Sequence, residues 1–280
     1  MKMSRILAAG AASGALLLAS NAALALQVQV TVTNNAPAGG VYLTPVWAGF
    51  HDGSFDSFNA GEAAAPGLEA IAEDGNVGPI SDVFDGTLTG DPVAGRVQGV
   101  VGSAPIGPGG SQSQTFDISD SGLNTYFSYA SMVLTSNDYF VANGDPLAIS
   151  IADILDGITN EISFTVGTPG SVYDAGTEVN DFSFAAGNGF FPGLGPGQGG
   201  PNQGTDENGV VTAVTGDPYA NFLNANGFDT SLLNFNNTSL YTNGIATITI
   251  SVVNPVPVPA ALPLMAGALG LLGFVRRRFS

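Results

Sequence analysis

The chain has no cysteine and only one histidine, His51, among its 280 residues. Without cysteine it can form no disulfide bond, no thiolate nucleophile and no Cys-ligated zinc site. With one histidine it cannot build a histidine-rich metal centre. Its glycine-rich runs also lack the Gly-Lys-Ser/Thr sequence that cradles phosphate groups. These absences remove several large classes of enzyme.

Basic residues are also scarce, with 6 Lys or Arg against 23 Asp or Glu and a formal net charge of −17. Five of the six lie at the two ends of the chain, so that Arg96 is the only basic residue between them. Nucleic acids are bound through Lys and Arg contacts to phosphate, so a nucleic-acid partner is excluded. Phosphate-rich substrates and anionic lipids are disfavoured for the same reason, and a cation is the expected partner.

The two ends of the chain are typical of targeting segments. Residues 1–25 combine basic Lys2 and Arg5, an apolar stretch and the small-residue site Ala23-Leu24-Ala25, which predicts a secretory signal peptide and its signal helix. Residues 255–280 contain a 16-residue apolar run, 260–275, that as a helix would be about 24 Å long. Three arginines follow it, as in a stop-transfer segment. We therefore expect export across the inner membrane and a C-terminal transmembrane helix.

The C-terminal segment resembles the PEP-CTERM family of bacterial sorting signals. The resemblance lies in the order of a Val256-Pro257-Val258-Pro259-Ala260 box, an apolar span and the arginine cluster Arg276–Arg278. It implies recognition by an exosortase-type membrane protease, removal of the tail and delivery to the cell surface or the extracellular space. The common acidic residue after the first proline is absent here. A plain single-span anchor is the alternative.

The region between the ends, residues 26–254, is predicted to be one all-β domain. Valines alternate with polar residues in 26–33, and a similar alternation in 246–252 suggests that the first and last strands are neighbours in one sheet. Turn residues bound the other candidate strands. The remaining expected strands are Val41–Phe50, Thr115–Ile118, Tyr126–Leu134, Glu161–Val166 and Val210–Val214. This pattern favours an antiparallel β-sandwich with long loops and short helices.

Few segments have a helical pattern. Residues 66–73 predict two turns of helix, and Asp217 followed by Pro218 predicts a helix start. Residues 146–155 fit either a strand or a helix. The Gly/Pro-rich stretch 187–204 has nothing to bury and is expected to be a long loop.

Catalytic chemistry has little support. His51 would be the only available base for a serine hydrolase, and no Gly-x-Ser-x-Gly elbow occurs in the domain. The simpler interpretation is a turn histidine beside Asp52. A glycosidase needs only a pair of carboxylates, which 23 acidic residues supply by chance, but a single tryptophan, Trp47, offers no aromatic-rich sugar groove. A secreted hydrolase is kept as the alternative.

Two acidic loops suit a cation better. Asp174 and Glu178 lie four residues apart around Gly176, which permits a tight turn, and Asp138 lies in a polar turn after an apolar strand. Calcium takes about 6–8 oxygen ligands from carboxylates, carbonyls and waters. Acidic turn residues are also common without any ligand, so the pattern alone leaves both interpretations open.

The domain also resembles the spondin N-terminal domain, over nearly all of residues 28–253. The matching stretches are 47–53, with His-Asp-Gly, 58–75, 136–140 and 174–181, with Asp-Ala-Gly-Thr-Glu. The resemblance implies an antiparallel sandwich of about eight strands and a calcium ion held by Asp138, Asp174 and Glu178. Animal members usually have Asp where Glu178 stands; Glu keeps the charge but reaches farther.

Together these observations predict a secreted, surface-sorted, calcium-binding β-sandwich that serves in adhesion or the extracellular matrix and is not an enzyme. Its expected partners are the calcium ion, the sorting protease and an extracellular polysaccharide or surface protein. A metal-free structural matrix protein is the remaining alternative.

Overall fold

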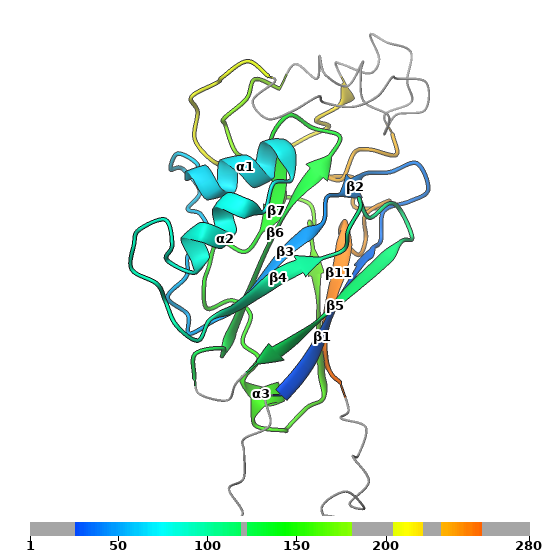
Figure 1. Ribbon diagram of the computed structural model, residues 1–280. Helices are drawn as coiled ribbons and strands as arrows, with labels where there is room; N and C mark the ends of the chain where they lie inside the picture. The colour runs from blue at the N-terminus through cyan, green and yellow to red at the C-terminus, as the bar shows by residue number, and fades with distance from the viewer. Residues whose placement is uncertain (1–25, 119–121, 181–203, 221–230, 254–280) are drawn as a thin grey trace, which may run out of the picture.

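A computed structural model describes residues 26–118, 122–180, 204–220 and 231–253. These residues form two antiparallel sheets and three short helices (Figure 1). The described part contains eleven strands, of which eight have four or more residues. The predicted all-β class with two packed sheets and short helices is therefore confirmed. The predicted signal peptide, the loop 187–203 and the C-terminal sorting segment lie outside the described residues.

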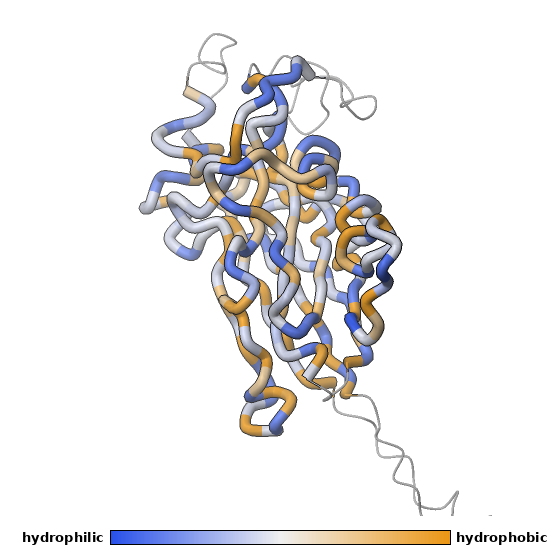
Figure 2. The backbone as a smooth tube through the Cα atoms, turned by 90° about the vertical axis from the view of Figure 1, so that its left-hand side faces the viewer, coloured by the Kyte–Doolittle hydropathy of each residue, from blue (hydrophilic) through white to orange (hydrophobic). Residues whose placement is uncertain are grey.

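The first sheet has four strands. In order across the sheet they are β5 (Ser111–Ile118), β1 (Leu26–Asn34), β11 (Ala246–Val252) and β8 (Glu161–Val166). Strand β1 pairs with β11, with Val30 opposite Ile250, which confirms that the first and last strands are neighbours. Alternate residues such as Val28, Val30 and Val32 are fully buried while the residues between them are more exposed. Figure 2, coloured by hydropathy, shows short hydrophobic and hydrophilic stretches interspersed along the described backbone.

The second sheet is larger, and its central strands are covered on both faces. Its path is β10 (Thr212–Ala213), β9 (Tyr173–Asp174), β7 (Tyr139–Ala142), β6 (Tyr126–Leu134), β3 (Val46–His51) and β4 (Val97–Val101), and β2 (Tyr42–Leu43) also pairs with β6. All six residues of β3 and eight of the nine in β6 are buried. A strand covered on both faces loses the alternation of a half-buried strand.

Two hydrophobic cores explain this burial. The main core fills the space between the sheets. The second core packs α1 (Pro66–Asp74) and α2 (Gly78–Phe84) against β3, β6 and β7, around the fully buried rings of Trp47 and Phe84, whose centroids are 5.1 Å apart. Figure 1 shows these two helices lying over one side of the sheet. The third helix, α3 (Ala152–Leu155), has only one turn.

Several elements differ from the predicted ones. The expected strand 41–50 is divided into β2 and β3, and residues 146–155 contain the helix α3 at their end. Helix α2 and strands β4, β7 and β9 were not predicted. The helix expected at 217–223 lies largely outside the described residues. Within the ranges that the structure describes, no helix is long and apolar enough to span a membrane.

Candidate metal centre

The turn between β6 and β7 and the end of β9 bring two of the predicted site residues together. Asp138 lies in that turn, one residue before β7, and Asp174 ends β9. Strand β7 pairs with β9 so that Tyr139 is opposite Asp174. The pairing therefore places the side chain of Asp138 beside the loop that begins at Asp174.

Asp138 is fully buried, and its two carboxylate oxygens have different environments. Its Oδ2 accepts hydrogen bonds from the backbone N–H of Thr177 at 2.8 Å and of Glu178 at 3.1 Å. Its Oδ1 is buried and has no hydrogen-bond partner among the described residues. A buried polar atom without a partner is costly in a folded protein. This oxygen therefore has lone pairs that are free to bind a ligand.

Asp174 is held by the same loop. Its Oδ1 accepts the N–H of Gly176 at 2.7 Å, and its Oδ2 accepts the side-chain Nδ2–H of Asn180 at 2.6 Å. The Oδ1 atom of Asn180 is a second buried oxygen that lacks a hydrogen bond within the described ranges. The sequence analysis did not select Asn180. Its position six residues after Asp174, in the same loop, was the only available signal.

The electrostatics of the pair favour a bound cation. Burial, with a smaller contribution from the nearby charge of Asp174, raises the pKa of Asp138 to about 7 against the hydrogen bonds from the loop. Burial also raises the pKa of Asp174. Two carboxylates in a poorly hydrated site repel each other, and a positive ion between them removes this repulsion. Carboxylate oxygens with free lone pairs suit a hard cation such as Ca²⁺.

Glu178, the third predicted ligand, has its carboxylate elsewhere. It is buried, and its Oε1 accepts the backbone N–H of Gly204 at 2.9 Å. Its own N–H donates to Asp138, so the residue joins the site through its backbone. Within the described part of the chain, no three acidic or histidine side chains form a group that could hold a metal. The residues that fit a cation are thus Asp138 and Asp174 with the amide oxygen of Asn180.

A further acid, Glu73 at the end of α1, lies close to this loop and was not predicted. Its side chain is almost fully buried. Burial, with a smaller contribution from the negative charge of Glu178, raises its pKa to about 7 against a hydrogen bond with Thr177. Acidic groups therefore crowd the helix side of the site as well.

Gly176 permits the close approach that shapes the loop. Its φ is +66°, and a Cβ added there would lie 2.7 Å from both the backbone N and the backbone O of Val210. We expect Gly176→Ala to lower the free energy of unfolding by about 2–4 kcal/mol, measured by urea titration. Gly157→Ala is the matched control, because Gly157 has a φ of +68° and open space around it. It should cost only about 1–2 kcal/mol, and an equal loss in both variants would contradict the steric role of Val210.

His51 is placed as a structural residue. It is fully buried at the end of β3, where its Nδ1 accepts the backbone N–H of Gly53 at 3.0 Å. The Nε2 atom must then carry the proton of the neutral ring and donate it to Ser128 Oγ, 2.9 Å away. A histidine in this tautomer cannot take the proton of that serine. Burial, with a smaller contribution from the charge of Arg96, lowers its pKa to about 4.

Comparison with known proteins adds no relative. No protein-family model matches the chain, and no curated protein matches it either.

Proposed function

We propose that this chain is an exported, calcium-binding β-sandwich that acts as a non-catalytic module in adhesion or the extracellular matrix. The observation that carries the proposal is the buried Asp138 carboxylate beside Asp174, with one oxygen that has no hydrogen bond within the described ranges. The resemblances to the spondin N-terminal domain and to the PEP-CTERM signal support the same function. In this proposal the ends of the chain direct export and sorting by an exosortase-type protease.

The donor set favours calcium over other metals. All the available side-chain atoms are oxygens, from Asp138, Asp174 and Asn180. Thiolate is absent and the one histidine is occupied elsewhere, so a site for zinc or copper has little support. Calcium also tolerates irregular coordination that is completed by waters, whereas magnesium requires near-octahedral geometry. In this arrangement Glu178 contributes through its backbone unless its side chain turns away from Gly204.

Calcium would act by joining the loop to the sheet. The 174–180 loop already contacts the β6–β7 turn through the amides of Thr177 and Glu178. A cation bound by Asp138 and Asp174 adds a second connection and removes the charge repulsion. The consequence is a loop whose rigidity depends on extracellular calcium.

Thermal unfolding of the purified full chain tests this proposal. If the dissociation constant is about 10⁻⁴ M, 10 mM calcium stabilises the fold by about 2.7 kcal/mol relative to chelator. For a domain of this size we expect the melting temperature to rise by about 5–10 °C. Asp174→Asn should abolish most of this rise, and Asp82→Asn, at an exposed position on α2, should retain it. An unchanged melting temperature in calcium and in chelator would favour the metal-free matrix protein instead.

A further inference from the structure

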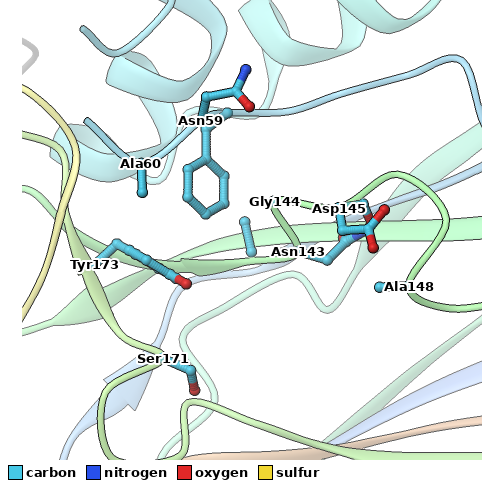
Figure 3. A pocket seen from close by; sticks show the side chains of 10 residues that line it. Asn59, Ala60, Asn143, Gly144, Asp145, Ala148, Ser171 and Tyr173 are labelled. Carbon is cyan, nitrogen blue, oxygen red and sulfur yellow. The ribbon is translucent and has the colours of Figure 1, made fainter. Parts of the chain in front are cut away.

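A cavity of about 420 Å³ lies beside Tyr173, the residue that precedes Asp174 in β9. Three separate segments line it: Phe58–Ala60 after β3, Ala142–Asp145 at the end of β7 with Ala148, and Ser171 with Tyr173 at the start of β9 (Figure 3). We call it the Tyr173 cavity. Its volume is within the range of about 300–1,000 Å³ that is usual for small-molecule sites.

Aromatic rings form a fixed wall of this cavity. The ring of Tyr173 packs edge-on against Phe58, with centroids 4.8 Å apart, and stacks on Phe140 at 5.7 Å. Phe58 and Phe140 also contact each other edge-on at 5.1 Å. Three mutually packed rings leave Tyr173 little freedom to rotate. The wall is therefore present before any ligand arrives.

Two polar groups of the cavity have unused hydrogen-bonding capacity. The hydroxyl of Tyr173 points towards the middle of the lining residues in Figure 3, and it makes no hydrogen bond with any residue that the structure describes. Asp145 is exposed, and one of its oxygens accepts the N–H of Leu147 at 2.9 Å. Its second oxygen remains available. The cavity thus offers a hydroxyl donor and a carboxylate acceptor beside an apolar surface.

The charge of the lining excludes acidic ligands. None of the described residues that line the cavity is Lys or Arg, and Asp145 supplies a negative charge. Phosphorylated, sulfated or carboxylated ligands would be repelled. Neutral sugars combine an apolar C–H face, which packs on aromatic rings, with hydroxyl groups that need acceptors such as a carboxylate.

We propose that the Tyr173 cavity binds a neutral sugar residue of an extracellular polysaccharide. The C–H face of the sugar packs on the half-buried ring of Tyr173, which the buried Phe58 supports, and its hydroxyl groups bond to the Tyr173 hydroxyl and the Asp145 carboxylate. This inference rests on the proposed adhesion function and names its ligand class. Tyr173 directly precedes Asp174 in β9, so the sugar site and the calcium site use adjacent residues of one strand.

Ligand-observed NMR and calorimetry on the full chain test the proposal. The probes are the neutral methyl glycosides of glucose, galactose, mannose and N-acetylglucosamine, with methyl glucuronide as an acidic probe and choline as a cationic one. We expect at least one neutral glycoside to bind, and the glucuronide and choline to bind more weakly. Tyr173→Phe and Asp145→Asn should each weaken binding by about fivefold to tenfold, and Tyr126→Phe, at a tyrosine outside the cavity, should leave it unchanged.

Three results would overturn the sugar site: no binding by any neutral glycoside, tighter binding of choline than of every glycoside, or equal affinity of the two cavity variants and the wild type. The calcium-dependent rise in melting temperature tests the proposed function separately. Tyr173→Phe keeps Asp138 and Asp174 and should keep that rise. A chain that responds to calcium but binds no glycoside therefore contradicts only the sugar site.

Discussion

Replacing Arg96 with alanine is expected to lower the free energy of unfolding by about 3 kcal/mol. The Nη1 of Arg96 donates to the backbone O of Phe84 at 2.6 Å, and the Nη2 donates to Ser54 Oγ at 2.8 Å. The guanidinium carbon also lies 5.2 Å from the ring centroid of Phe84 and 5.8 Å from that of Phe55. One side chain therefore joins the end of α2, the loop after β3 and the start of β4.

Two companion variants make this prediction specific, with urea unfolding monitored by the fluorescence of the buried Trp47. Lysine keeps the charge but lacks the planar fork, so Arg96→Lys should recover less than half of the loss. Gln112→Ala, at an exposed position on β5, should change the free energy of unfolding by less than about 0.5 kcal/mol. Full recovery by lysine would show that charge alone matters and would contradict the role of the two directed hydrogen bonds.

The half-buried strands were predictable because apolar and polar residues alternate along each of them. The alternation in 26–33 and 246–252 located β1 and β11, and the predicted limits of Glu161–Val166 match β8. Strand β6 is buried on both faces, and its predicted limits, Tyr126–Leu134, came instead from an apolar run between turn residues. Strand β4 has intermediate burial over four of its five residues and no such alternation. Helix α2 has seven residues and no side-chain N-cap. Both depend on tertiary contacts, with Trp47 and Arg96 among their partners.

The sequence predicted which acidic residues lie near the candidate site, but not how their side chains are oriented. The loop chemistry around Gly176 and the turn at Asp138 are local features, and the sequence shows them directly. The pairing of β7 with β9 decides that Asp138 meets Asp174, and it joins segments more than thirty residues apart. The direction of the Glu178 carboxylate depends on the backbone of Gly204, 26 residues away. A pattern of residue types carries no information on such a contact.

In calcium-free buffer, Asp138→Asn is expected to stabilise the fold at pH 8 by about 2–4 kcal/mol. Burial raises the folded-state pKa of Asp138 to about 7 from its ordinary value of 3.8. The folded state therefore holds a proton that the unfolded state has released, and stability falls as the pH rises from about 4 to about 7. The asparagine cannot ionise, so this fall is absent. Its oxygen can replace Oδ2 as the acceptor for the two loop amides, and its NH₂ can fill the position of the unpartnered Oδ1.

Saturating calcium should reverse the order of the two proteins, because the wild-type carboxylate gains a cation that the amide binds weakly. Urea unfolding at pH 4, 6 and 8, without and with calcium, measures both effects.

Glu73, with its raised pKa, and His51, with its lowered pKa, also make stability depend on pH, in opposite directions. Both are present in the two proteins and cancel in the difference, whereas the pKa of Asp174, which is also raised, depends on Asp138 and is part of the measured effect. Asp82→Asn should follow the wild type at every pH. If the free energy of unfolding of Asp138→Asn also runs parallel to that of the wild type across this pH range, Asp138 ionises in the metal-free fold without an energetic cost. That result would remove the electrostatic reason for a cation at this site.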